Sequence, residues 1–189
     1  GTYRRRTEGM LPEGEIVFLD EVFKSNSAIL NSLLTLLNER RYVSGGATLE
    51  CPLLTAIGAS NEVPADADLA AIFDRFLLRV RTDYLDAFHF QDLLQRGWEL
   101  EARIGPGQKA TPLLSAEELR QAQRAIAQRT QFTDAFLSAY RGLVLQIRAE
   151  GIGLSDRRVV KLLKLCAASA FLDGRTAPDA SDLFVLQHV

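Results

Sequence analysis

The order of apolar runs and polar breaks in the first eighty residues predicts strands joined by helices. Uninterrupted apolar runs at Ile16–Leu19 and Leu53–Ala59 are typical of strands buried in a parallel sheet, and Phe76–Val80 has the composition of a third strand. Apolar residues at helical spacing from Ile29 to Leu37 predict a helix that faces the core. The segment Tyr42–Cys51 has turn residues at its centre and is expected to form a hairpin.

Beyond Arg81 the apolar spacing is helical throughout, which predicts an all-helical second part. Capping signals and apolar stripes together predict helices at Phe90–Arg103, from Ser115, at Thr133–Glu150, from Ser155 and from near Pro178. We therefore expect an α/β domain with a parallel sheet over residues 1–84 and an all-helical domain over residues 85–189.

Composition and charge narrow the class of protein. The 189 residues are 47% hydrophobic and 24% charged, which suits a soluble protein with a packed core, and the net charge of −2 argues against a nucleic-acid surface. No apolar run is long enough to span a membrane. Cys51 and Cys166 lie in apolar surroundings and suggest buried, reduced thiols of a cytoplasmic protein. His89 and His188 have no partner at ligand spacing, so we expect no zinc site.

Two adjacent carboxylates, Asp20 and Glu21, follow the first predicted strand directly. The end of a buried parallel strand opens into a site, and paired acids there suit phosphate chemistry. The first acid would hold Mg²⁺ through its waters, and the second would polarise a water for attack on a phosphate. The alternative is a strand followed by an acidic turn.

Two further polar residues are placed to join this chemistry. Asn61 follows the second predicted strand, and its amide could reach a phosphate or an attacking water if the two strands are neighbours. It could equally only turn the chain. Arg75 precedes the third predicted strand; such an arginine usually makes a surface salt bridge, but in a ring of subunits it could reach the neighbour's nucleotide.

Arg157 and Arg158 stand in the first turn of the helix that Ser155 opens. Positive side chains in a first turn oppose the helix dipole, and this local conflict favours a function such as gripping a phosphate. The alternative is that both arginines are solvated.

Together these motifs resemble the AAA+ ATPases and, more narrowly, the MoxR family near its RavA-like branch. The segment around that family's Walker B motif is similar to Arg5–Pro12, Glu15–Glu21, Ala28–Leu34 and Asn38–Arg40. Its sensor 1, arginine-finger and sensor 2 motifs are similar to Ala59–Glu62, Phe73–Leu77 and Ser155–Arg158, respectively.

The resemblance implies the C-terminal part of a P-loop parallel-sheet core followed by an α-helical lid, with ATP and Mg²⁺ as cofactors. By the resemblance, Asp20 holds Mg²⁺ through water, Glu21 activates the hydrolytic water, and Asn61 positions that water. Arg75 acts on ATP bound by the adjacent subunit. Either Arg157 or Arg158 closes the lid onto the phosphates.

One part of the family's pattern is absent. The sequence contains no G-x-x-x-x-G-K-[ST] phosphate loop, which in the family lies upstream of the matching segment. We therefore expect this segment alone to bind ATP poorly or not at all.

In the complete protein, the resemblance implies an ATPase that forms a ring homo-oligomer, a hexamer by analogy, and remodels a client protein that the sequence does not name. The alternatives are a helicase-like DNA motor and a scaffold that does not hydrolyse ATP.

Overall fold

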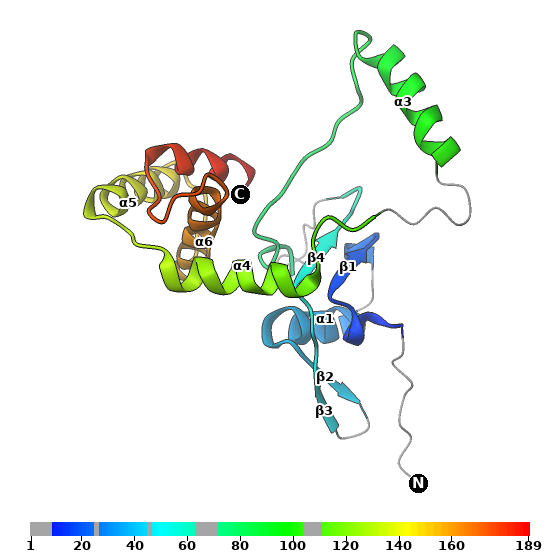
Figure 1. Ribbon diagram of the computed structural model, residues 1–189, viewed down its shortest axis with the longest axis horizontal. Coiled ribbons are helices and arrows are strands. Elements are labelled where there is room, and N and C mark those ends of the chain that lie inside the picture. Colours follow the sequence, from blue (N-terminus) through cyan, green and yellow to red (C-terminus); the bar gives the residue numbers. More distant parts are fainter. Residues whose placement is uncertain (1–8, 25–26, 45–46, 63–71, 104–110) are drawn as a thin grey trace.

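The computed structural model describes residues 9–24, 27–44, 47–62, 72–103 and 111–189 (Figure 1). Residues 5–8, which carry part of the family resemblance, lie outside the described residues. The two predicted strands are β1 (Ile16–Leu19) and β4 (Thr55–Gly58), and they pair in parallel with Ile16 opposite Thr55 and Leu19 opposite Gly58. The predicted parallel sheet is confirmed, and the condition set for Asn61, that the two strands are neighbours, is met.

The helix α1 (Ser27–Glu39) covers one face of this sheet, because its apolar stripe and the inward strand residues form shared clusters. Leu36 packs with Val17 and Ala56, while Leu30 and Leu33 pack with Leu19. Short 3-10 helices flank the strand β1 on either side, and the predicted hairpin forms. These elements are η1 (Leu11–Glu13), η2 (Val22–Lys24), β2 (Arg41–Ser44) and β3 (Ala47–Glu50).

The prediction that β1 is buried on both faces is wrong. Ile16 and Phe18 are 62% and 64% exposed, and Ile57 beside them on β4 is 51% exposed. These side chains share the face opposite α1, because alternate residues of a strand point to opposite sides. Among the described residues, one helical layer covers this sheet, whereas a parallel sheet usually has two.

The predicted strand Phe76–Val80 does not form. A strand needs a neighbouring strand for its backbone groups, and here those groups have other partners. The carbonyls of Phe76 and Leu77 accept hydrogen bonds from Arg158, and the amide of Arg79 donates to the carbonyl of His188 over 2.6 Å. Contacts with the helical part therefore replace the expected sheet ladder.

The helical part contains the predicted helices close to their expected bounds: α3 (Phe90–Arg103), α4 (Ala116–Arg129), α5 (Asp134–Ala149) and α6 (Asp156–Leu172). The capping box between Ser115 and Glu118 is present. The last predicted helix is a 3-10 helix, η3 (Ala180–His188). None of the helices in the described ranges is both long and apolar enough to cross a bilayer.

The helices α5 and α6 share a core made of Phe136, Tyr140, Val144, Leu162 and Cys166. Both cysteines of the chain are unpaired and buried, as predicted. Burial raises the pKa of the Cys166 thiol to about 11. The helix α4 runs from this core towards the sheet (Figure 1), where Arg120 forms an ion pair with Glu15 at the start of β1.

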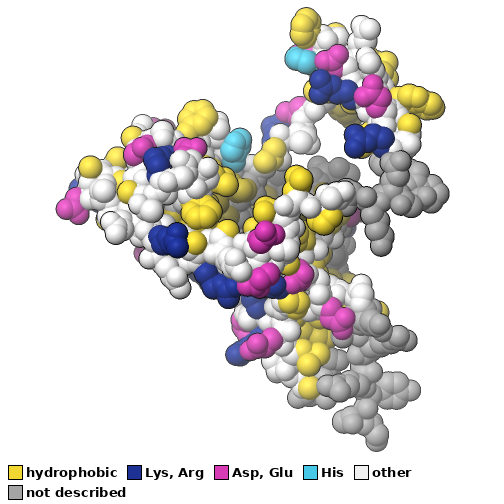
Figure 2. Space-filling view, in the orientation of Figure 1, with side chains coloured by type: hydrophobic (Ala, Val, Ile, Leu, Met, Phe, Trp, Pro, Cys, Tyr) yellow, Lys and Arg dark blue, Asp and Glu magenta, His cyan; other side chains and the backbone are white. Residues whose placement is uncertain are grey.

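By contrast, α3 stands apart from the other helices in Figure 1. Figure 2 shows exposed hydrophobic side chains on it, and Phe90, Leu94 and Trp98 are 50%, 60% and 78% exposed. It follows residues 78–86, which form no helix or strand. The boundary predicted between residues 84 and 85 falls in this segment and stays a prediction.

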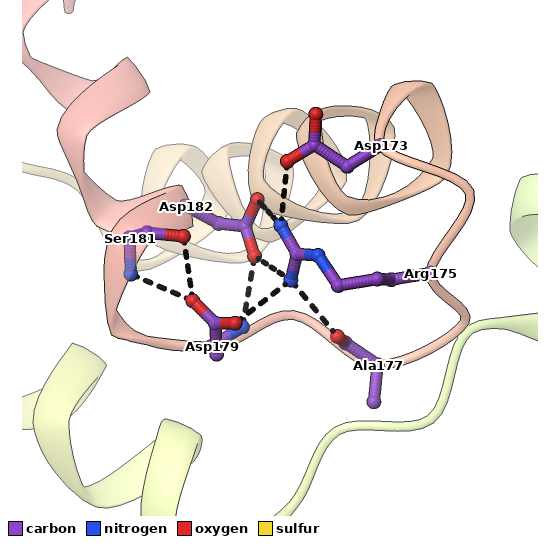
Figure 3. A network of polar contacts seen from close by, with 6 residues as sticks. All are labelled: Asp173, Arg175, Ala177, Asp179, Ser181 and Asp182. Carbon is purple, nitrogen blue, oxygen red and sulfur yellow. Dashed lines mark hydrogen bonds and ion pairs between the residues drawn. The ribbon is translucent and has the colours of Figure 1, made fainter.

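A polar network fixes the chain between α6 and η3 (Figure 3). The guanidinium of Arg175 binds both carboxylate oxygens of Asp182, with distances of 2.8 and 2.9 Å, and Asp182 is 1% exposed. The backbone amide of Asp179 donates to the same carboxylate over 2.8 Å. Burial raises the pKa of Asp182, but the hydrogen bonds from Arg175, Ser169 and the Asp179 amide outweigh it, so that the pKa lies below its usual range.

Substituting Asp182→Asn is expected to lower the free energy of unfolding by about 2 kcal/mol. This is below the range for breaking a fully buried pair, because Arg175 is partly solvated. Because the folded state lowers the pKa of Asp182, its contribution is present above the unfolded pKa of about 3.9 and is lost as the pH falls through the folded value. Urea unfolding followed by circular dichroism at pH 7 and at pH 3 measures the loss of stability in the variant and its dependence on pH.

The matched control for this prediction is Asp173→Asn. Asp173 also pairs with Arg175, over 3.0 Å, but is 67% exposed, so its loss is expected to fall within the error of the measurement. If both variants lowered the free energy of unfolding by the same amount, burial of Asp182 would not be the source of its contribution to stability.

Candidate active site

The parallel pairing of β1 and β4 brings three predicted site residues to one edge of the sheet. Asp20 and Glu21 follow the end of β1, and Asn61 follows the end of β4. Backbone hydrogen bonds continue past the strand ends, since Ala59 N donates to Leu19 O over 2.9 Å and Val22 N donates to Ala59 O over 3.2 Å. All three side chains are exposed at this edge.

The turn that presents Glu21 is conformationally unusual. Glu21 has a φ of +47°, in the left-handed region that non-glycine residues seldom adopt. The carboxylate of Asp20 accepts a hydrogen bond from the Glu21 amide over 2.9 Å and so supports the turn. Backbone strain of this kind is concentrated at functional sites, where the surrounding structure holds it in place.

Lys24 lies at the same edge of the sheet and pairs with Glu21. Its ammonium donates to Glu21 Oε1 over 2.7 Å, and both side chains are about half exposed. The hydrogen bond and the charge of Glu21 raise the pKa of Lys24, with smaller contributions from the charges of Glu62 and Asp20. Carboxylates that follow both strands therefore act on the same ammonium group.

The donor set at this edge fits Mg²⁺ held through water. In the described ranges, no group of three or more His, Cys, Asp or Glu side chains is gathered as a metal cage. Mg²⁺ does not need such a cage, because it retains several waters and binds through one or two carboxylates together with substrate phosphates. The exposed Asp20 carboxylate can supply that contact.

The segment that carries Arg75 lies against the start of α6. Arg158 on α6 is 3% exposed and donates to Asp74 O over 2.9 Å and to Asp74 Oδ1 over 3.1 Å. Arg75 itself is half-buried, and Arg157 is exposed. Burial lowers the pKa of Lys161 on α6, and the charges of Arg157 and Arg75 lower it further.

The predicted site residues thus form two groups. Asp20, Glu21 and Asn61 lie at the sheet edge, and Arg75 and Arg157 lie near the first turns of α6. The carboxylates of the first group raise the pKa of Lys24. Besides burial, the arginines of the second group lower the pKa of a different lysine, Lys161.

Comparison with known proteins identifies the family. Residues 1–124 match the family described as the MoxR domain in the MoxR-vWA-beta-propeller ternary systems. The chain belongs to this MoxR family. Residues 141–189 of the MoxR chain also match the AAA lid domain family, so the chain combines part of an AAA+ ATPase core with a helical lid.

Two curated relatives come from Methanocaldococcus jannaschii. The uncharacterized protein MJ0812 is 36% identical over 98% of this MoxR chain and 47% of its own length. The uncharacterized protein MJ0079 is 36% identical over 98% of this chain and 46% of its own length. The chain therefore spans about half the length of the curated relatives it matches.

The fold of the MoxR chain also occurs in a solved structure. The crystal structure of a protein from Cytophaga hutchinsonii, described there as a proposed ATPase, matches with a TM-score of 0.72. The sequence identity is 19%, and the match covers 95% of this chain and 58% of the other. At this identity the match supports the fold alone, a P-loop ATPase core with a helical lid.

Sequence reasoning missed two residues that contact this MoxR site, Lys24 and Asp74. Lys24 follows Glu21 by three residues, a spacing that allows an ion pair across a turn. The sequence also left open whether Arg157 or Arg158 contacts the phosphates, and burial of Arg158 was not predicted. The sequence did carry a signal for this burial, because residues four apart lie on one face of a helix. Apolar residues follow Arg158 at this spacing, and the whole set is buried: Arg158, Leu162, Cys166 and Ala170.

Proposed function

We propose that this MoxR chain carries the catalytic half of an ATP hydrolysis site, in which water attacks the γ-phosphate in line. The observation that carries the proposal is the parallel pairing of β1 and β4, which brings Asp20, Glu21 and Asn61 to one edge of the sheet. Asp20 would hold Mg²⁺ through water, and the ion when bound would neutralise charge on the phosphates. Glu21 orients and activates the attacking water, and Asn61 positions it.

The second group of residues contributes two arginines to the same reaction, Arg75 from a neighbouring subunit and one arginine of the lid. In a ring homo-oligomer, a hexamer by family resemblance, Arg75 reaches the nucleotide of the adjacent subunit and neutralises charge that develops in the transition state. Of the two arginines on α6, we assign the phosphate contact of the lid to Arg157. This choice is supported by exposure, since Arg157 is exposed and the guanidinium of Arg158 is buried against residues 74–77.

The biological role that we infer is chaperone-like remodelling of a client protein in the cytoplasm, with a placement near the RavA-like branch of MoxR proteins. The description of the matched family names vWA and β-propeller components, and we propose proteins with these domains as partners. Hydrolysis would shift the lid relative to the core and transmit force to the client.

Removal of the metal tests the sheet-edge assignment. Excess EDTA is expected to abolish phosphate release by the full-length protein, and Asp20→Asn is expected to raise the Mg²⁺ concentration for half-maximal release by about tenfold. The reason is that Asp20 is the carboxylate that orients the water shell of the ion. A colorimetric phosphate assay across a Mg²⁺ titration gives the measurement.

Asp83→Asn is the matched control, because Asp83 is exposed and pairs with Arg81 outside the site. It is expected to keep the parent's Mg²⁺ dependence. If Asp20→Asn also kept it, Asp20 would not hold the metal. If the parent itself released no phosphate at any Mg²⁺ concentration of the titration, the non-hydrolysing scaffold would be favoured.

A further inference from the structure

A single buried guanidinium joins the lid to the segment that carries Arg75. Arg158, in the first turn of α6, donates from Nη1 to Asp74 O over 2.9 Å and from Nη2 to Leu77 O over 3.3 Å. A longer contact of 3.5 Å joins Nη1 to Phe76 O, and Asp74 Oδ1 lies 3.1 Å from Nη1. These partners flank Arg75 on both sides in the chain.

The chemistry of this contact is specific to arginine. The planar guanidinium presents several N–H donors in a fixed fork, which lets one side chain bind carbonyls that point in from successive residues. A lysine offers a single ammonium and cannot reach all of them at once. Holding the lid to the core would not by itself need a charge, because an apolar side chain can replace a buried ion pair without loss of stability.

Other contacts fix the same segment to the helical part. Leu77 packs against the core of α5 and α6, and the Arg79 amide donates to His188 O over 2.6 Å. Within the segment, the guanidinium of Arg79 lies 3.9 Å from the centre of the Phe73 ring. On its other side the segment packs in the core of the sheet and α1, through Ile72 and Phe76. Arg75 therefore stands on a piece of backbone whose position depends on α6 as well as on the sheet.

We propose that Arg158 is a positioning residue for Arg75. Its hydrogen bonds to residues 74–77 hold Arg75 in the geometry that reaches the neighbour's nucleotide, so that the position of α6 in one subunit controls hydrolysis in the next. This inference rests on the proposed function, in which Arg75 acts on ATP of the adjacent subunit.

A kinetic double-mutant cycle in the full-length protein tests the inference. Arg158→Lys is expected to lower kcat about tenfold with little change in KM, since misplacing a catalytic group reduces the rate more than it reduces binding. In the Arg75→Ala background, Arg158→Lys is expected to have no further effect, because it acts through Arg75. An equal tenfold loss in both backgrounds would overturn the proposal and leave Arg158 a purely structural role.

A second variant covers the case in which Arg158→Lys does not fold. Asp74→Asn removes the negative charge that pairs with the Arg158 guanidinium, at a side chain that is 42% exposed, so the fold is expected to remain intact. We expect a severalfold loss of kcat that again vanishes in the Arg75→Ala background. A melting curve for each variant shows whether it is folded.

Arg148→Ala is the control for the loss of arginine contacts elsewhere in the lid. Arg148 donates to Leu154 O and pairs with Asp156, and neither residue lies beside Arg75 in the chain. The kcat of the Arg148→Ala variant is expected to equal that of the parent. If Arg75→Ala itself left kcat unchanged, the proposed role of Arg75 in hydrolysis would be wrong. If Arg75→Ala lowered kcat but Arg158→Lys and Asp74→Asn left it unchanged, only the positioning role of Arg158 would be wrong.

Discussion

Substituting Arg75→Ala is expected to lower phosphate release by the full-length protein about a thousandfold, with ATP binding retained. An arginine that enters a neighbouring active site stabilises charge in the transition state and contributes little to ground-state binding, and its loss typically reduces kcat by about 10³-fold or more. Steady-state phosphate release and the binding of a fluorescent ATP analogue measure the two quantities separately.

Arg81→Ala is the matched control for this substitution. Arg81 lies six residues further along the same segment, is 87% exposed and pairs with Asp83. We expect it to keep the parent's rate. A loss of ATP binding in the Arg75 variant that matched its loss of rate would instead indicate a ground-state contact.

Mixed rings show in which subunit Arg75 acts. Subunits with Glu21→Gln cannot activate water at their own site but keep Arg75, whereas subunits with Arg75→Ala have an intact water-activating site but lack the arginine. Mixing the two is expected to restore measurable phosphate release, at sites where an Arg75→Ala subunit receives the arginine of a Glu21→Gln neighbour. No recovery in rings confirmed to be mixed would mean that Arg75 acts within its own subunit.

The features that the sequence predicts correctly depend on local signals. The helix α4 begins at Ser115 because the Ser115 hydroxyl and the Glu118 carboxylate satisfy each other's backbone amides, and both residues are visible in the sequence. The parallel direction of β1 and β4 follows from two apolar runs joined by a helix, since a helical crossover usually connects parallel strands. The structure adds that the two strands are direct neighbours. The position of Asp20, Glu21 and Asn61 at one edge then follows.

The features that the sequence does not predict depend on contacts between distant residues. Phe76–Val80 has the composition of a strand, but its backbone groups are taken by Arg158 and His188, more than seventy residues away in the chain. The exposure of Ile16 and Phe18 likewise depends on what covers the sheet and not on their own strand propensity.

Burial of Arg158 is an intermediate case. The conflict between two arginines and the dipole at the start of α6 favoured a function such as gripping a phosphate, with two solvated arginines as the alternative. Arg158 is not solvated, since it is 3% exposed. The spacing of Arg158 from Leu162 and Cys166 places it on the buried face of α6, but only the structure shows that carbonyls beside Arg75 are what it binds.

Substituting Glu21→Gln is expected to lower the rate of phosphate release at least about 100-fold, because the amide cannot accept a proton from the attacking water. ATP binding is expected to persist, because the variant removes a charge that would lie near the anionic phosphates. The neighbouring acid Glu62 supplies a matched control, since its charge reaches the same Lys24. Glu62→Gln is expected to hydrolyse ATP at the parent's rate.

Whether this sheet edge hydrolyses ATP is tested by phosphate release from the full-length parent and from Glu21→Gln, measured together at saturating Mg²⁺ and ATP. We expect the variant to bind ATP and to form the same oligomer as the parent but to release almost no phosphate. Equal rates from the two proteins would remove Glu21 from the mechanism, and with it the assignment of this sheet edge as a hydrolytic site.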